Sequence, residues 1–291
     1  EVRIMKKIIG TVLTLVMVLS GVSVLAEAFN AAHDIVILSR EDGSGTRGAF
    51  VELFGVEVKN AEGQKVDMTT EEAVITNSTA VCMTSVAGND YAIGYISLGS
   101  LGDTVKALSV NGVEATAQNI VSGSYTISRP FNIAVKDDPS ELAGDFIAYI
   151  MSAEGQRIVG DNGYIPVENV QPYAGSAIAG RLVVGGSSSV TPVMEKLVEG
   201  YKAVNPSAEL EIQQSDSTSG MNGVVDGVLD IGMASRALKD SELEAGLTPT
   251  VIAMDGIAVI VNKENPLNDI TSEQVRQIYT GEAYTWDEII G

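Results

Sequence analysis

The sequence has very little of the two residues on which most catalytic and metal sites depend. Its 291 residues include one histidine, His33, and one cysteine, Cys82. One histidine cannot form a metal cluster, and its place near the start of the chain disfavours histidine-based catalysis. One cysteine cannot form an internal disulfide. Cys82 lies in the small apolar stretch TAVCMTSVA, where we expect it to be buried rather than reactive.

Positive charge is also scarce. The chain has 38 Asp and Glu residues against 18 Lys and Arg residues, and its formal net charge is −20. A protein this acidic is a poor partner for nucleic acid or for an anionic membrane surface. Any site for a small anion must therefore rely on local dipoles and hydrogen bonds, because the overall field of the protein repels anions.

Long apolar runs are absent apart from one near the start, which reads MKKIIGTVLTLVMVLSGVSVLAEA from Met5. Two lysines, an apolar run and small residues are the layout of a secretory signal peptide. We therefore expect residues 1–28 to be a signal peptide and the protein to be periplasmic, extracellular or at the cell surface. An uncleaved membrane anchor is the alternative. Val22 stands where a lipoprotein signal has its cysteine, so we expect no lipid anchor.

After this segment, strand-like and helix-like runs alternate. Apolar spacing predicts strands at 34–39, 92–98, 131–136, 181–186, 208–215, 229–235 and 251–262. It predicts helices at 47–55, 70–88, 139–163 (with a local start at 152–155), 190–205, 220–229 and 271–281. The alternation indicates an α/β protein with a mixed or parallel sheet. Segment 167–180 has small-residue clusters and no strong period, and we expect it to be a linker.

Three loops rich in Gly, Ser and Thr follow predicted strands and lead into helices. They are 42–47 (DGSGTR), 185–190 (GGSSSV) and 215–220 (SDSTSG). The start of a helix leaves backbone N–H groups unpaired and carries a partial positive charge, so an oxyanion fits there without a lysine. Glycine allows a close backbone approach, and hydroxyl groups add donors. Together the loops predict an oxyanion site.

Each loop alone has a simpler interpretation, because Ser or Thr at a helix start is often only an N-cap. The sequence has no GxxxxGK[ST] motif, which disfavours a nucleotide P-loop. A serine hydrolase is also disfavoured, because no histidine is placed to act as its base.

Longer segments carry a more specific pattern. They are SREDGSGTRGAF, AIGYISLGSL, YTISRPFNIAV, SAEGQRIVGDNGYIPV, VVGGSSSVTPVMEKLVEGY, DIGMASRALKDSE, DGIAVIVNKENPLNDITSEQVRQIYTGE and TWDEIIG. In these segments, which cover almost the whole chain after the signal, the protein resembles the periplasmic phosphate-binding proteins of bacterial phosphate ABC importers. The resemblance implies a two-lobed α/β fold of the type II periplasmic-binding-protein class, with the ligand in the cleft between the lobes.

The order of these segments differs from the usual order of that family. There the GSSSV-type segment comes first, and the SREDGSGTR-type segment follows the TWDEIIG-type segment in mid-chain. Here SREDGSGTR opens the mature chain and TWDEIIG closes it, which resembles a circular permutation. The linker 167–180 would then join the family's usual termini. The alternative is a fragment of a longer protein in which two half-copies abut.

In a permuted chain one lobe becomes contiguous and the other is split. The resemblance implies a contiguous lobe at 127–264 and a split lobe at 33–126 plus 265–291. The chain would cross between the lobes near 128–130 and 262–264.

The resemblance also implies which residues hold the anion. Arg40 and Asp42 look like the paired charges at the phosphate. Further donors are implied at Ser44, Gly45, Thr46, Ser187, Ser188, Ser189, Thr218, Ser219 and Ser235. Asp42 would be selective, because a protonated phosphate oxygen can donate to it and sulfate cannot, at a cost to sulfate of about 1–3 kcal/mol. Alternatively, Arg40 and Asp42 pair only with each other.

Two further arginines, Arg236 and Arg47, have other expected roles. Some family members have an acidic residue at the position of Arg236, which here either donates to the ligand or closes the cleft by pairing with the opposite lobe. Arg47 is expected to face solvent or the other lobe rather than to bind the ligand. Structural roles are expected for Tyr125, Arg129 and Trp286.

These features predict an exported solute-binding protein, not an enzyme, that captures inorganic phosphate and delivers it to the permease subunits of an ABC importer. We expect a monomer with no metal, no cofactor and no nucleic-acid partner. The alternatives are a binding protein for another tetrahedral oxyanion, a surface or sensory module without transport, and a secreted hydrolase that uses Ser44 or Asp42.

Overall fold

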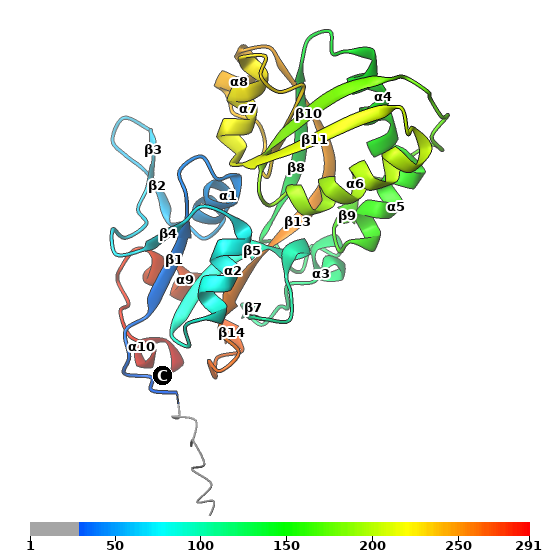
Figure 1. Ribbon diagram of the computed structural model, residues 1–291. Helices are drawn as coiled ribbons and strands as arrows, with labels where there is room; N and C mark the ends of the chain where they lie inside the picture. The colour runs from blue at the N-terminus through cyan, green and yellow to red at the C-terminus, as the bar shows by residue number, and fades with distance from the viewer. Residues whose placement is uncertain (1–28) are drawn as a thin grey trace, which may run out of the picture.

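The computed structural model describes residues 29–291, and the predicted signal peptide at 1–28 lies outside these residues. Two lobes are built on one continuous ten-stranded sheet (Figure 1). Its strands are β1 (Val36–Arg40), β4 (Val74–Thr76), β5 (Ala92–Ser97), β6 (Lys106–Ala107), β8 (Ser128–Lys136), β9 (Ile165–Pro166), β10 (Gly180–Ser187), β11 (Ala208–Ser215), β12 (Ile231–Ala234) and β13 (Leu247–Val261).

The sheet is mixed, as the sequence predicts. Its order is β11-β10-β12-β8-β13-β5-β1-β4, and β6 and β9 pair with β13. Strand β10 runs parallel to both β11 and β12, and β1 runs parallel to both β4 and β5. Strand β13 runs antiparallel to its neighbours β8 and β5. The alternation of strands and helices therefore gives the expected α/β fold.

Smaller elements complete the chain. Two further strand pairs are β2 (Glu57–Lys59) with β3 (Lys65–Asp67), and β7 (Ser109–Val110) with β14 (Asp269–Ile270). The helices are α1 (Gly45–Leu53), α2 (Thr79–Ala87), α3 (Ala117–Val121), α4 (Glu141–Ile150), α5 (Ala153–Asp161), α6 (Thr191–Val204), α7 (Ser217–Val225), α8 (Asp240–Glu244), α9 (Ser272–Tyr279) and α10 (Asp287–Ile290), with a 3₁₀ turn η1 (Leu98–Ser100). None of the helices within residues 29–291 has the length and apolar character that a membrane crossing requires.

Two of the predicted helices are divided in the structure. The run at 70–88 forms β4 first, and α2 begins only after Ser78, whose side chain accepts the N–H of Val81. The run at 139–163 is split into α4 and α5, because Ser152 caps the second helix by accepting the N–H of Gly155. Both divisions occur at a serine that satisfies a free N–H group of the helix that follows it.

The long strand β13 joins the two lobes. Its first part, 247–256, pairs with β8, and its second part, 257–261, pairs with β5. One hydrophobic cluster draws its buried residues from 131–253 and a second from 35–127 and 257–289. We call the part around the first cluster the contiguous lobe and the part around the second the split lobe. The crossing therefore lies near residue 256, not at 262–264 as the sequence suggested, because the strand changes partners partway along its length.

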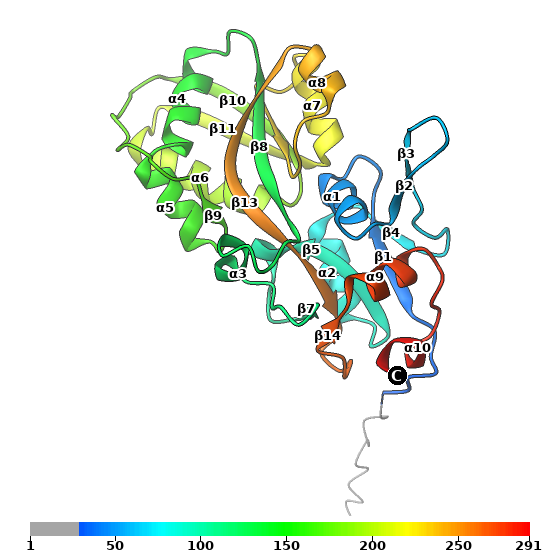
Figure 2. The same cartoon turned by 180° about the vertical axis from the view of Figure 1, so that it is seen from behind.

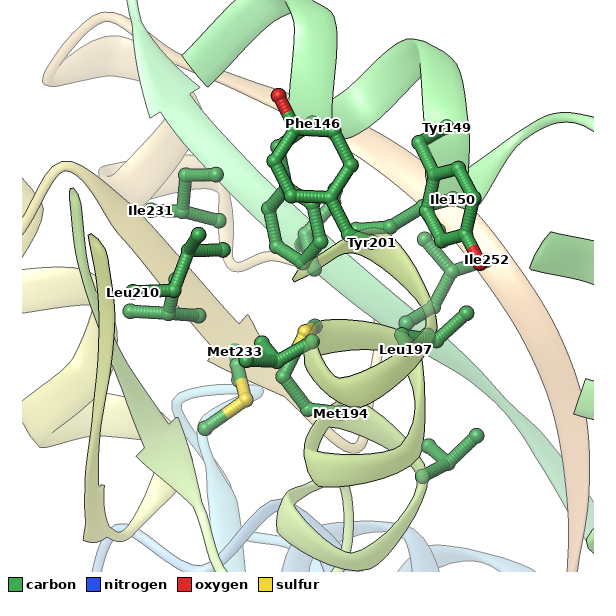
Figure 3. Close-up of a cluster of buried hydrophobic side chains, with 14 of the residues drawn as sticks. Phe146, Tyr149, Ile150, Met194, Leu197, Tyr201, Leu210, Ile231, Met233 and Ile252 are labelled. Carbon is green, nitrogen blue, oxygen red and sulfur yellow. The ribbon is translucent and has the colours of Figure 1, made fainter. Parts of the chain in front are cut away.

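The contiguous lobe has a core of aliphatic and aromatic side chains (Figure 3). Helix α6 contributes Val193, Met194, Leu197, Val198 and Tyr201, whose spacing places them on one face. This face packs against the sheet and against α4 and α5, so the loop that precedes α6 is held by a rigid core.

The two ends of the described chain lie side by side (Figures 1 and 2). Asp34 forms a β-bridge with Thr285, and the N–H of Trp286 donates to the carbonyl of His33 at 3.2 Å. Trp286 is fully buried, as expected for a structural residue. Residues 169–179 form no helix or strand and precede β10.

Candidate anion-binding site between the lobes

Four helices begin at the junction of the lobes. Helices α1 and α2 come from the split lobe, and α6 and α7 come from the contiguous lobe. Three of them follow the loops that the sequence predicted, and α2 is an addition. Each helix start brings unpaired N–H groups and partial positive charge. Hydroxyl groups from these starts are in mutual contact, which shows that the four starts converge.

The contacts between hydroxyls cross from one lobe to the other. Thr46 on α1 and Ser189 before α6 share a hydrogen bond of 2.7 Å. Thr79 on α2 shares one of 3.0 Å with the same serine. All three side chains are buried. A set of buried hydroxyls from opposite lobes is an unusual use of polar groups, and it gathers hydrogen-bonding groups of both lobes in one place.

Ser235, at the end of β12, extends this set within the contiguous lobe. Its hydroxyl accepts from Ser187 at 3.0 Å, and its N–H donates to the hydroxyl of Ser217 at 3.1 Å. It also lies 3.4 Å from the hydroxyl of Thr46. The end of β12 therefore joins the loop before α6, the start of α7 and the start of α1.

Arg40 brings a buried guanidinium into the cluster. Only 2% of its side chain is exposed, and Nη2 donates to Ser188 at 3.0 Å, while Nη1 donates to Thr79 at 3.2 Å. Its Nε and Nη2 groups also donate to the carboxylate of Glu41 at 2.8 Å. The guanidinium is thus fixed by its neighbour in sequence and reaches across to the other lobe.

A second buried guanidinium, that of Arg129, contacts Thr46. Its Nη2 donates to the Thr46 hydroxyl at 3.0 Å and to Asp255 at 3.2 Å. Both charged side chains are buried. Burial lowers the pKa of Arg129 to about 10, although the charge of Asp255 opposes this shift. Burial raises the pKa of Asp255 to about 6, and the charge of Arg129 limits that rise.

Gly45 allows the two lobes to approach closely at this point. A methyl group added at its Cα would lie 2.5 Å from the Ser217 hydroxyl and 2.8 Å from that of Ser235. Both distances are well below contact, so any side chain here would push α1 away from the contiguous lobe.

The structure brings together more than half of the residues that the sequence assigned to the anion. Those in the cluster are Arg40, Gly45, Thr46, Ser187, Ser188, Ser189 and Ser235. Ser44 is buried beside them, but its hydroxyl accepts the N–H of Arg47 and caps α1. For Ser44 the capping interpretation therefore accounts for the contact that the structure shows.

Asp42 does not lie in the cluster, which corrects the expectation that it stands beside Arg40 at the anion, and it does not form the alternative pair with Arg40 either. Its side chain is 99% exposed and accepts from Arg47 at 2.9 Å. The chain turns at Gly43, where φ is +87°, and Asp42 faces outward before this turn. Glu41 pairs with Arg40 in its place. Arg47 also binds Asp67, and thus stays within the split lobe.

Three residues of the contiguous lobe also differ from the expectation. Ser219 is exposed, and its hydroxyl donates to Asp216. The N–H of Thr218 donates to the carbonyl of Gly43 at 3.1 Å, so it joins the lobes at the rim of the cluster. The guanidinium of Arg236 pairs with Glu242 of its own lobe at 2.7 Å and donates to Thr218 at 3.2 Å, so among the described residues it pairs with no charge of the opposite lobe.

Thr79, Ser217 and Arg129 were missed by the sequence reasoning. Thr79 lay inside a run taken for a continuous helix, although the pair Ser78-Thr79 is a typical helix start. Ser217 lies next to the residues that were chosen, in the same loop. Arg129 was placed at the crossing between lobes, which is where it lies, but its contact with Thr46 was not foreseen. Across residues 29–291, no group of three or more His, Cys, Asp or Glu side chains could hold a metal ion.

Comparison with known proteins agrees with this fold and site. Residues 22–154 and 171–291 match the family model described as PBP superfamily domain. The phosphate-binding protein PstS 2 of Streptococcus agalactiae serotype V is 51% identical over 277 residues, which cover 93% of this chain and 94% of that protein. PstS 2 of Streptococcus pneumoniae serotype 4 is 42% identical over 261 residues, which cover 89% of each chain.

A solved structure is also similar. It is the crystal structure of a phosphate-binding protein of a phosphate ABC transporter from Streptococcus pneumoniae TIGR4, with 43% identity and a TM-score of 0.69. The match covers 88% of this chain and 99% of that chain. Because the alignments run through nearly the full length of these relatives, the order of segments seen here is shared with them.

Two lobes joined by crossing strands, with polar groups gathered between them, define a solute-binding protein, a class that binds its ligand without making or breaking bonds. The chain belongs to the PBP superfamily and, within it, to the PstS-like phosphate-binding proteins. This confirms the family expected from the sequence, along with its α/β fold and its non-enzymatic class.

Proposed function

We propose that this protein captures inorganic phosphate between its lobes and delivers it to the permease subunits of an ABC importer. The observation that carries the proposal is the buried cluster in which Thr46 and Arg40 of the split lobe contact Ser189 and Ser188 of the contiguous lobe. A tetrahedral oxyanion accepts hydrogen bonds on every oxygen, so it fits a centre toward which donors converge from two sides. The names of the streptococcal relatives support phosphate as the ligand.

The proposed mechanism is closure of the lobes around the anion. Opening would separate the hydroxyl pairs that join the lobes and expose the helix starts to water. Phosphate would then enter, and closure would add the donors of the second lobe to those of the first. The bending point would be where β8 begins and β13 changes partners, near Ser128 and Gly256. The domains proposed from sequence, 127–264 and 33–126 plus 265–291, would move as the two lobes, except that 257–264 would move with the split lobe, because β13 pairs with β5 from residue 257.

Several further features belong to the same proposal. The protein would be exported by its signal peptide, act outside the cytoplasm as a monomer without a lipid anchor, and need no metal or cofactor. Relative to family members with the other segment order, the chain would be a circular permutant. The adjacency of Asp34 and Thr285 supports this, because a direct join there would need little rearrangement.

Calorimetric titration with phosphate and then sulfate tests the proposal. We expect saturable phosphate binding that is lost or weakened by at least about 100-fold in Arg40→Ala, because a buried charge-assisted donor is removed and Glu41 is left without its partner. Arg157→Ala is the matched control, since Arg157 is 70% exposed and pairs with Asp161 on the same helix. Absence of phosphate binding by the unmodified protein would refute the proposal.

A binding protein for a broader set of tetrahedral oxyanions is the second candidate. The exposure of Asp42 favours it, because the carboxylate expected to discriminate against sulfate lies outside the cluster. The carboxylates near the cluster, Glu41 and Asp255, are each paired with an arginine. If phosphate and sulfate bind with similar affinity, this candidate is correct and strict selectivity is wrong.

A further inference from the structure

A buried ion pair lies where the lobes meet, and it touches the candidate site. Arg129 on β8 and Asp255 on β13 are directly opposite each other in the antiparallel pairing of these strands. Their side chains are 3% and 1% exposed and 3.2 Å apart. They form the last pair but one of the β8–β13 pairing, two positions before β13 begins to pair with β5 at residue 257. The pair is thus anchored on the two strands that connect the lobes.

From this anchor the Arg129 guanidinium reaches the hydroxyl of Thr46 at 3.0 Å. A threonine hydroxyl has one proton to donate and two lone pairs that accept. Because Arg129 can only donate, it occupies a lone pair of Thr46 and leaves the hydroxyl proton free for another acceptor. In the structure the hydroxyl of Ser189, from the contiguous lobe, lies 2.7 Å from that of Thr46 and can accept this proton.

The remaining donors of Arg129 show that its hydrogen-bonding capacity is only partly used. Its Nε and Nη1 groups are buried and find no acceptor among the described residues. Burying such donors is costly, and an arginine that only braced two strands would be expected to use them. A negative charge beside the guanidinium would offset part of this cost.

We propose that Arg129, held by Asp255, is a positioning residue of the anion site, which fixes Thr46 as a hydrogen-bond donor to the bound oxyanion and supplies a second positive charge beside Arg40. This inference rests on the proposed phosphate-binding function and adds a residue pair to it. It also places part of the site's charge on the strands about which the lobes would move.

The decisive variant removes both partners at once. Arg129→Met combined with Asp255→Leu replaces the ion pair with apolar side chains and leaves no unpaired buried charge, so folding is retained better than with either single change. We expect phosphate affinity to fall about 10- to 100-fold, the range of one charge-assisted hydrogen bond. Arg157→Met with Asp161→Leu is the matched control, because it removes an exposed pair of the same types, and its affinity should be unchanged.

A double-mutant cycle with Thr46→Val separates a positioning role from a purely structural one. We call the variant with Arg129→Met and Asp255→Leu the Met/Leu variant. If Arg129 acts through the Thr46 hydroxyl, Thr46→Val should reduce phosphate affinity much less in the Met/Leu variant than in the unmodified protein. If the Met/Leu protein does not fold, the same cycle is run with Arg129→Lys, which keeps the charge but loses the planar fork.

The outcomes are distinct. The inference is supported if the unmodified protein binds phosphate, the Met/Leu variant binds it more weakly, and the affinity losses in the cycle are not additive. Unchanged affinity in the folded Met/Leu variant, or additive losses in whichever cycle is measured, overturns it while the proposed function stands. No phosphate binding by the unmodified protein refutes the proposed function itself.

Discussion

At the scale of the residue, the site depends on which of two neighbouring side chains faces inward. In the first loop Glu41, not Asp42, pairs with Arg40, and in the third loop Ser217, not Ser219, is buried. The sequence predicts loops rich in donors because composition and position suffice for that. It does not predict the inward-facing residue, because a shift of one position in a turn, or of two positions along a helix, points a side chain in nearly the opposite direction.

Substitution of Gly45 tests whether phosphate binding requires α1 to lie close to the contiguous lobe. We expect Gly45→Ala to weaken phosphate binding by about 5- to 150-fold, because the added methyl group meets the Ser217 and Ser235 hydroxyls and overpacking of this kind costs about 1–3 kcal/mol. Gly48→Ala, in the same helix, is the control, since nothing lies within 4 Å of the added methyl group. Titration of both variants with phosphate checks this, and equal affinities would contradict it.

Asp255 should make the stability of the protein depend on pH. Burial raises its pKa to about 6 from an ordinary 3.8, so between these values the folded protein holds a proton that the unfolded chain releases. Its contribution to the free energy of unfolding is therefore fully present below pH 3.8 and is lost as pH rises through about 6. Arg129 and Tyr164 are the titratable groups that act on it, and the N–H of Gly99 donates to its carboxylate at 3.2 Å.

The Asp255→Asn variant removes this titration. Urea unfolding of both proteins measures the difference in their free energies of unfolding. We expect the unmodified protein to be more stable relative to the variant at about pH 4.5 than at about pH 7.5. The same difference at both pH values would show that Asp255 does not titrate in this range.

At the scale of the element, the site depends on where the helices begin. Strand β11 has the predicted bounds, and most other long strands are within a few residues, because period and composition define them locally. The prediction of a helix at 70–88 was wrong for its first half, where the β-branched residues Val74, Ile75 and Thr76 form the edge strand β4. That error concealed Thr79, since a residue inside a helix offers no free N–H group.

Ser44 tests whether a helix start serves as a cap or as a ligand group. We expect Ser44→Ala to lower the free energy of unfolding by about 0.5–2 kcal/mol and Ser44→Gly by only a few tenths, because glycine is tolerated at the N-cap. Phosphate affinity should change less than about threefold in the glycine variant, since the hydroxyl already accepts the N–H of Arg47. A large loss of affinity with little loss of stability would instead make Ser44 a direct ligand.

At the scale of the whole molecule, the sequence predicts two lobes and their order along the chain, but not where β13 passes from one to the other. The run at 251–262 is apolar throughout, so it predicts a strand without showing that the strand has different partners at its two ends. Pairing at residue 257 is decided by contacts with β5, far away in sequence.

Ligand binding between lobes should stabilise the molecule as a whole. At phosphate concentrations about 100 times the Kd, we expect the free energy of unfolding to rise by about 2.7 kcal/mol, as for any ligand that binds only the folded state. Thermal unfolding with and without phosphate measures this. Arg40→Ala should show little shift at the same concentration, and an equal shift in that variant would place phosphate elsewhere.

A crystal structure of the protein with phosphate tests the central claim most directly. The account predicts one phosphate within hydrogen-bond distance of Thr46 and Arg40 from the split lobe and of the serines at 187–189 from the contiguous lobe. A phosphate bound to one lobe alone, or bound away from this cluster, would contradict it.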